Sequence, residues 1–204
     1  MYAQRLPSPV SFDEFVVWLP ESSSQRYELH RGVVVEMPKP KGKHSQVAGY
    51  VIKTLNHAID QGRQPWFIPR ECLVRTGADI AYEPDAIVLN EPALADEPDW
   101  ERGSIVALGQ SIQVVVEVVS TNWQDDYLHK LADYELMGIP EYWIIDYAAL
   151  GGRRFIGNPK QPTITICSLV DGEYQLQQFQ ASDRLISTTF PALQVNATEI
   201  LQGG

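Results

Sequence analysis

Two acidic residues that interrupt or open apolar segments are the first sign of chemistry in this chain. Glu117 lies inside the apolar run from residue 114 to residue 119, and Asp85 opens another apolar segment. An unpaired carboxylate is expensive to bury, so proteins pair such a charge or use it to bind metal. Two carboxylates on neighbouring strands can hold one hard divalent cation through oxygen. Such a cation can activate water and polarise a phosphoryl oxygen.

Both residues also have ordinary structural explanations. Glu117 could end a strand, where an arginine or a helix N-terminus would pair with it. Asp85 follows a proline and could be a turn residue, since Asp and Pro are common in turns. If the two carboxylates face each other without metal, their repulsion should raise at least one pKa. On that basis, Asp85→Asn is expected to stabilise the metal-free protein.

Lys130 is the third candidate, on a helix predicted to follow Glu117. Near a phosphate, its ammonium could orient the nucleophile or stabilise the charge of the transition state. Asp126 lies four residues earlier, so Lys130 could instead form an exposed i,i+4 ion pair on that helix. In either case, Lys130→Ala is expected to change stability little.

Glu28 and His44 are weaker candidates. Glu28 could be a third carboxylate of the site, or it could belong to the polar face of a hairpin. His44 could cap a helix, contact phosphate or bind metal, although a lone histidine is more often structural. The loop before His44 could hold phosphates through its lysines, although such a loop is more often a solvated turn; the lysines are Lys39, Lys41 and Lys43.

The elements that position these residues follow from hydrophobic spacing. The longest helix is predicted over residues 44–59, where apolar residues recur every four positions: Val47, Val51, Leu55 and Ile59. A second long helix is predicted over residues 122–137. Ser11 is predicted to cap a short first helix over residues 12–19.

Strands are predicted where β-branched and aromatic residues cluster. Residues 112–119 are almost wholly apolar and should form a central strand buried on both faces. With the following helix and a strand over residues 142–145, they suggest a right-handed crossover within one sheet. Residues 92–103 are predicted to be an acidic loop. The remaining strands are predicted over residues 27–30, 33–37, 66–68, 72–75, 86–89, 163–170 and 174–179.

Length and composition indicate one globular domain. The chain has 204 residues, of which 44% are hydrophobic and 21% charged. No segment approaches the roughly 18 consecutive apolar residues of a membrane span. The two cysteines, Cys72 and Cys167, lie far apart, which fits a reducing compartment and offers no zinc site. We therefore expect a cytoplasmic, single-domain protein over residues 1–204, with a core at 12–150 and a C-terminal β extension at 151–204.

The charge distribution leaves DNA open as a partner. The net charge of −10 weakly disfavours nucleic acid, because phosphate contacts need lysine and arginine. Residues 1–80 nevertheless hold ten Lys and Arg against eight Asp and Glu, whereas residues 81–204 hold six against eighteen. A local basic patch can bind DNA on an acidic protein.

Several motifs occur together in an order that resembles the Uma-two family. They are Tyr27-Glu28-Leu29-His30-Arg31-Gly32, His44, Pro84-Asp85-Ala86-Ile87-Val88, Val116-Glu117-Val118-Val119-Ser120, Asp126, Lys130, and Tyr134 through Asp146. The resemblance covers about residues 12–200, and it is specific from Glu117 to Asp146, whereas Pro-Asp alone is not. The family is classed as restriction endonuclease-like, within the PD-(D/E)XK nuclease superfamily.

The resemblance implies an α/β (α+β) fold, in which helices flank a restriction endonuclease-like mixed central sheet; the strands beyond residue 160 add a C-terminal β-hairpin. It implies Mg²⁺ or Mn²⁺ held by Asp85 and Glu117, with Lys130 and Glu28 as further catalytic residues. One position departs from the superfamily pattern. The lysine expected two residues after the second acid is Val119, so its function would move to Lys130.

Two functions are open at this point. The first is a Mg²⁺-dependent endonuclease that hydrolyses DNA, expected to be a homodimer because two-fold symmetry gives one site to each strand of a duplex. The second is a catalytically inactive nuclease fold that acts as a binding or regulatory module, as the acidic charge and Val119 suggest. The enzyme hypothesis requires Asp85, Glu117 and Lys130 to converge on one cleft.

Overall fold

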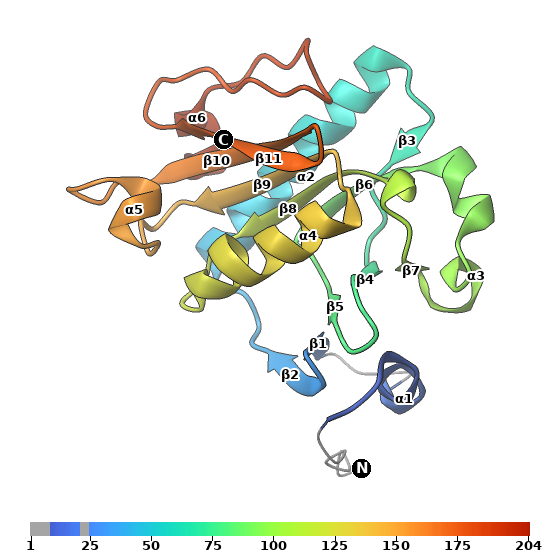
Figure 1. Cartoon of the computed structure of the whole chain (residues 1–204). Coiled ribbons are helices and arrows are strands. Elements are labelled where there is room, and N and C mark those ends of the chain that lie inside the picture. Colours follow the sequence, from blue (N-terminus) through green and yellow to red (C-terminus); the bar gives the residue numbers. More distant parts are fainter. Residues whose placement is uncertain (1–8, 21–24) are drawn as a thin grey trace.

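Two mixed β-sheets form the framework of the protein, whose computed structural model describes residues 9–20 and 25–204 (Figure 1). The larger sheet has the order β11-β10-β9-β8-β6-β3, with bounds Glu173–Phe179, Thr163–Val170, Glu141–Asp146, Ile112–Val118, Ala86–Asn90 and Trp66–Phe67. The smaller sheet has the order β2-β1-β5-β4-β7, with bounds Val33–Met37, Arg26–His30, Ala81–Tyr82, Leu73–Arg75 and Ile105–Val106. The expected mixed central sheet is therefore present, and a second sheet carries the N-terminal hairpin.

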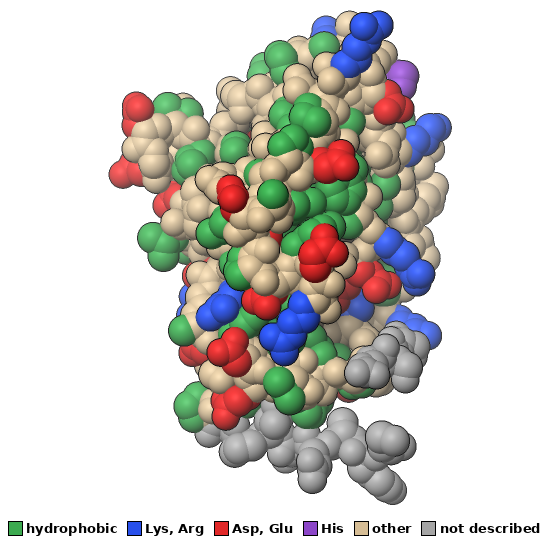
Figure 2. Space-filling view, turned by 90° about the vertical axis from the view of Figure 1, so that its right-hand side faces the viewer, with side chains coloured by type: hydrophobic (Ala, Val, Ile, Leu, Met, Phe, Trp, Pro, Cys, Tyr) green, Lys and Arg blue, Asp and Glu red, His purple; other side chains and the backbone are tan. Residues whose placement is uncertain are grey.

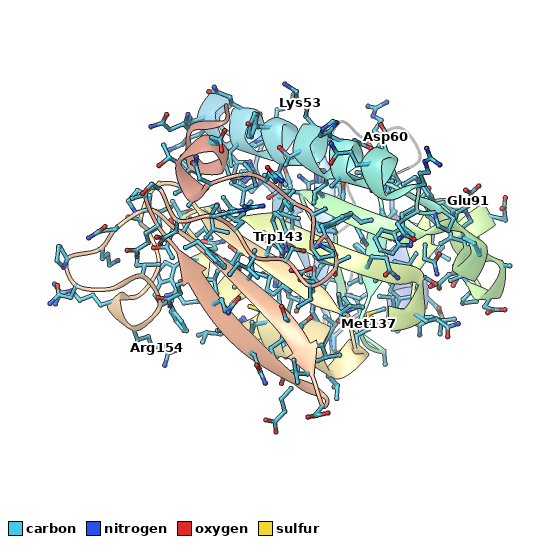
Figure 3. The ribbon with its side chains drawn as sticks, turned by 90° about the horizontal axis from the view of Figure 1, so that it is seen from above. Lys53, Asp60, Glu91, Met137, Trp143 and Arg154 are labelled. Atoms are coloured by element: carbon cyan, nitrogen blue, oxygen red, sulfur yellow. The ribbon has the colours of Figure 1, made fainter. Side chains whose placement is uncertain are left out.

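Helices α2 (Gly42–Gly62) and α4 (Leu131–Met137) cover opposite faces of the six-stranded sheet (Figures 1 and 3). Side chains alternate between the faces of a strand. Thus Val114 and Val116 of β8 pack in the core that contains the apolar residues of α2. Val115 packs in the core that contains Tyr134 of α4. Glu117 shares the face of Val115, so β8 directs this carboxylate toward the side of α4.

Most of the predicted elements are confirmed. The first helix is α1 (Phe12–Trp18), and Ser11 caps it in a reciprocal pair: Ser11 Oγ accepts the Glu14 amide at 3.3 Å, and Glu14 Oε2 accepts the Ser11 amide at 2.8 Å. The second long helix differs from the prediction, because it opens with a π-helical segment, Asp125–Lys130, before α4 begins. The acidic loop also differs, since it folds into the 3-10 helix Glu91–Asp96 and the short helix α3 (Trp100–Gly103).

The C-terminal part continues the large sheet. Strands β10 and β11 form the predicted hairpin, and β10 pairs with β9 in antiparallel register. Two short helices, α5 (Arg153–Ile156) and α6 (Ala197–Gln202), complete this part. Within the described residues, the structure has no helix of the length and apolarity that crossing a membrane requires.

Gly109 lets the 3-10 helix Gly109–Ser111 approach the end of α4, the helix that continues from Lys130. A Cβ at this position would overlap the carbonyl oxygen of Met137. Gly109→Ala should therefore lower the free energy of unfolding by about 1–3 kcal/mol, the usual cost of added atoms in a packed site. Urea denaturation measures this change.

Gly49 in α2 is the matched control, because a Cβ there meets nothing within 4 Å. Gly49→Ala should raise stability by about 0.5–1 kcal/mol, since alanine replaces glycine inside a helix. Stabilisation by both alanines would show that the contact at Gly109 is not tight.

Candidate active site

The end of the β6–β8 pair brings the two predicted carboxylates together. In this antiparallel pair, Ala86 lies opposite Val116, and the next step of the same register puts Asp85 beside Glu117. Residues opposite each other on an antiparallel pair share a face. The Val118 amide also donates a hydrogen bond of 2.9 Å to Asp85 Oδ2, which fixes the Asp85 carboxylate against the end of β8.

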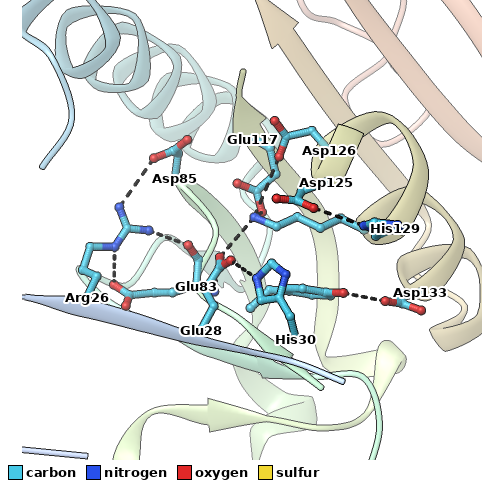
Figure 4. Close-up of polar contacts among 12 residues, drawn as sticks. Arg26, Glu28, His30, Glu83, Asp85, Glu117, Asp125, Asp126, His129 and Asp133 are labelled. Carbon is cyan, nitrogen blue, oxygen red and sulfur yellow. Dashed lines mark hydrogen bonds and ion pairs between the residues drawn. The ribbon is translucent and has the colours of Figure 1, made fainter. Parts of the chain in front are cut away.

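Glu28 reaches the same place from the smaller sheet (Figure 4). It is fully buried, and its Oε1 accepts hydrogen bonds from Lys130 Nζ and from the Glu83 amide, both at 3.1 Å. Its Oε2 lies 2.7 Å from His30 Nε2. Glu28 is therefore a third carboxylate of the cluster, on a face of the β1–β2 hairpin that is turned toward the site.

Lys130 lies at the centre of the cluster. Its side chain is only 3% exposed, and Nζ donates hydrogen bonds to Glu117 Oε1 at 2.9 Å and to Glu28 Oε1 at 3.1 Å. Asp126 Oδ1 lies 3.8 Å from the same nitrogen. The exposed ion pair that the sequence allowed is therefore wrong, because the π-helical segment turns both residues inward. Such segments occur frequently at functional sites.

Three further side chains of the cluster were not identified from the sequence. Tyr134 Oη donates a hydrogen bond of 3.1 Å to Glu117 Oε1. Arg26 Nη1 lies 3.6 Å from Asp85 Oδ1, and His30 contacts Glu28 as described. Arg26, Glu28 and His30 alternate along β1, and residues two apart share one face of a strand. This period-two pattern of polar residues could have revealed Arg26 and His30.

His44 belongs to the cluster, whereas the neighbouring lysines differ in position. His44 Nε2 lies 2.9 Å from the Val118 carbonyl oxygen and 3.3 Å from Asp85 Oδ2. It does not cap α2, whose N-cap residue is Lys41. Lys43 Nζ donates a hydrogen bond to the carbonyl oxygen of Gln202, so the structure places Lys43 against α6.

One cavity of about 360 Å³ collects these groups. Its lining includes Asp85, Glu117 and Lys130, so the convergence that the enzyme hypothesis requires is present. Glu28, Asp126, His44, Lys39 and Lys41 also line it, and Lys43 does not.

A single ammonium is shared among three buried carboxylates, and their pKa values separate accordingly. Burial raises the pKa of Glu28, but Lys130 and His30 more than offset this effect and lower the pKa to about 2. Burial raises the pKa of Glu117, Lys130 lowers it, and the charges of Asp85 and Glu28 raise it again, to about 7. Burial also raises the pKa of Asp126 well above its ordinary value. Glu28 therefore stays ionised, while Glu117 and Asp126 hold protons more readily.

Asp85 and His44 form a separate pair, with His44 Nε2 lying 3.3 Å from Asp85 Oδ2. Burial raises the pKa of Asp85, but hydrogen bonding from His44 and Val118 and the charge of Arg26 lower it overall. Burial lowers the pKa of His44, and Asp85 more than offsets this, so the pKa is raised. Burial, together with repulsion from Asp85 and Glu28, thus raises the pKa of Glu117, whereas the pKa of Asp85 is lowered. The expected stabilisation by Asp85→Asn loses its basis, because the Asp85 carboxylate is well supplied with donors.

The oxygen donors suit a hard divalent cation. Among residues 9–20 and 25–204, no group of three or more His, Cys, Asp or Glu side chains is arranged to hold a metal. Mg²⁺ commonly uses only one or two carboxylates and keeps several waters. Asp85 Oδ1 and Glu117 Oε2 accept no hydrogen bond from any described residue. Glu117 Oε2 could therefore serve the cation that the family implies, and Asp85 Oδ1 could do so in place of its ion pair with Arg26 Nη1, which lies 3.6 Å away.

Lys130→Ala should lower the free energy of unfolding by about 3–5 kcal/mol at pH 8, because it leaves buried carboxylates without their counter-charge. This replaces the expectation of little change, which assumed an exposed lysine. The loss should shrink at pH 5, where Glu117 is protonated. Chemical denaturation at both pH values measures it.

Lys53→Ala is the control for this change, since Lys53 is exposed on α2 (Figure 3) and its removal should alter stability by no more than about 0.5 kcal/mol. Equal effects of the two substitutions would contradict a buried charge network.

Glu117 should also make the stability of the metal-free protein fall as pH rises. Its pKa is about 7 in the folded protein and 4.5 in the reference state, so the folded state binds more protons between these values. The contribution of Glu117 to stability, about 3 kcal/mol, is therefore fully present below pH 4.5 and is lost as pH rises through 7.

Glu117→Gln should remove this loss, which denaturation in EDTA at pH 5 and pH 8 will measure. Glu173→Gln, at an exposed position of β11, should leave the wild-type pH dependence in place. Parallel curves for wild type and Glu117→Gln would rule out titration of Glu117 in this range.

The comparisons with known proteins agree with this geometry. The Uma2 family, described as "Putative restriction endonuclease", matches residues 12–198. A crystal structure from Anabaena variabilis ATCC 29413, described as "a putative nuclease belonging to DUF820", has a similar fold. Its TM-score is 0.72 at 18% sequence identity, over 96% of this chain and 99% of that chain. Among curated proteins, none matches. Because the family match spans nearly the whole sequence, the chain belongs to the Uma2 family, the Uma-two family that its motifs resemble.

Proposed function

We propose that this protein is a metal-dependent endonuclease that hydrolyses DNA phosphodiester bonds. The observation that carries the proposal is the meeting of Asp85, Glu117 and Lys130, from three separate elements, at one cavity. Two carboxylates can hold a cation and one ammonium can stabilise developing negative charge, which are useful contributions to the hydrolysis of a phosphodiester. The description of the family supports the same chemistry.

The residues of the cavity have separate roles in this proposal. Bound by Asp85 and Glu117, Mg²⁺ or Mn²⁺ would supply Lewis-acid chemistry for water and for a phosphoryl oxygen. Lys130 and Tyr134 hold Glu117 Oε1, which leaves Oε2 for the cation. Glu28 balances the charge of Lys130 and fixes the position of its ammonium.

Lys130 acts through its charge. Hydrolysis joins the oxygen of water to phosphorus and breaks one P–O bond of the diester, so negative charge grows on the phosphoryl oxygens. Burial lowers the pKa of Lys130, but Glu117, Glu28 and Asp126 raise it well above its ordinary value. The amine therefore stays protonated at neutral pH, where it can stabilise this charge and cannot act as a general base.

The remaining features of the proposal concern DNA and assembly. Lys41 is exposed at the cavity and would contact a phosphate next to the scissile one. A homodimer stays a prediction. In a dimer with two-fold symmetry, one site could meet each strand of a duplex. A non-catalytic binding module is the alternative outcome of the following experiment.

Asp85→Asn should greatly reduce cation-dependent cleavage, because it removes the charge of a proposed metal ligand. The protein should stay folded, because the asparagine oxygen can still accept the hydrogen bond from the Val118 amide. We expect cleavage of labelled DNA in Mg²⁺ to fall on the order of a hundredfold or more. Calorimetry should show Mn²⁺ affinity reduced by at least about tenfold, since even loss of an outer-shell partner has that effect.

Asp60→Asn makes the same chemical change at an exposed position of α2 and should alter neither measurement (Figure 3). Equal Mn²⁺ affinity in wild type and Asp85→Asn would remove Asp85 from the metal site. Absence of cleavage by the wild type in both Mg²⁺ and Mn²⁺ would favour the binding-module alternative.

A further inference from the structure

The candidate catalytic side chains line a small cavity and are themselves largely buried. The cavity volume is about 360 Å³, and Glu28 and Glu117 in its lining are 0% and 4% exposed. This volume lies near the lower end of the range of about 300–1,000 Å³ that is typical of sites for small ligands. The space therefore suits one nucleotide better than a duplex, whose major groove alone is about 12 Å wide.

The lining of the cavity also supplies apolar surface. Met37, Pro38 and Pro40 line it from the end of β2 and the loop that follows, and Tyr147 and Leu150 line it from the segment after β9. Base faces stack on aromatic and apolar side chains when a nucleotide is unpaired. Inside a duplex these faces are covered by neighbouring base pairs. The apolar lining therefore suits an unpaired nucleotide better than a paired one.

Few basic residues of the cavity are available to contact phosphates. Lys39 and Lys41 are exposed in its lining, and neither has an ion pair with a described residue. Arg26, in contrast, is paired with Glu83 at 3.0 Å and with Asp85 at 3.6 Å. Figure 2 shows that acidic and basic side chains are interspersed on the side of the molecule where α3 lies. Two free ammonium groups suit a few phosphates of one strand, not the six to ten contacts typical of duplex binders.

We infer that the substrate is an unpaired DNA strand, such as a single strand, a flap or a bubble, and not an intact duplex. This inference rests on the proposed endonuclease activity and specifies its substrate class. The strand enters with one nucleotide against the apolar lining near Tyr147, its phosphate beside Asp85, Glu117 and Lys130, and an adjacent phosphate at Lys39 and Lys41.

Three labelled oligonucleotides of one sequence test the inference: a single strand, its full duplex, and a duplex with a central unpaired bubble. Fluorescence anisotropy in Ca²⁺ measures binding, and incubation in Mg²⁺ or Mn²⁺ measures cleavage. The single strand and the bubble should bind at least about tenfold more tightly than the duplex, and cuts should fall in unpaired DNA. The slope of log K against log salt should be about −1.4, since each of two phosphates contributes about −0.7.

Two variants connect the preference to the cavity. Tyr147→Ala should weaken single-strand binding by about tenfold, within the range expected for one stacked base, and should leave weak duplex binding unchanged. Lys41→Ala should make the salt slope shallower by about 0.7. Tyr50→Ala is the matched control, because Tyr50 is a half-buried tyrosine of α2 outside the cavity lining, and it should change neither quantity.

The possible failures are distinguishable. Equal or tighter binding and equal or faster cutting of the full duplex would overturn the inference and leave the proposed endonuclease intact. If none of the three DNAs is cut, the proposed activity fails, while the anisotropy measurements still decide whether the cavity prefers unpaired strands.

Discussion

The buried ammonium of Lys130 is the interaction on which the arrangement of the site depends. It joins Glu28 from the smaller sheet to Glu117 from the larger one, and it extends from a helix that packs on the larger sheet. An ionised carboxylate at this position needs a counter-charge, because an unpaired buried charge costs several kcal/mol. The same contact therefore holds two sheets and a helix together and places three functional groups within hydrogen-bonding distance.

The cluster carries more negative charge than Lys130 can balance. Burial raises the pKa values of Asp126 and Glu117, and the neighbouring carboxylates raise them further, whereas Asp85 is balanced separately by His44 and Arg26. An arrangement selected for stability alone would replace part of this cluster with apolar side chains, which are often neutral or stabilising in place of buried ions. Excess buried acid beside a cavity is instead what a cation-binding site needs, and its cost falls on the metal-free protein.

The sequence predicted local elements better than the partners of those elements. Helix α2 and strand β8 follow from apolar spacing, which is a local property. The division into two sheets depends on pairings between distant segments, and no local pattern marks it. The π-helical segment also has no sequence signature, so the spacing of Asp126 and Lys130 was interpreted as an ordinary exposed helical pair. Asp85 and Glu117 were found because a carboxylate beside or within an apolar run is unusual, while His30 was missed although it alternates with Glu28.

The valine that stands in place of the expected superfamily lysine does not leave the carboxylates without an ammonium. Val119 lies two residues after Glu117, so both side chains belong to the same side of the sheet. Val119 is buried and packs in the core that contains Tyr127, from the π-helical segment that ends with Lys130. A lysine at position 119 would thus approach Glu117 from the strand, whereas here the ammonium approaches it from the helix above. Position 119 is then free to be apolar, because the ammonium that meets Glu117 comes from Lys130.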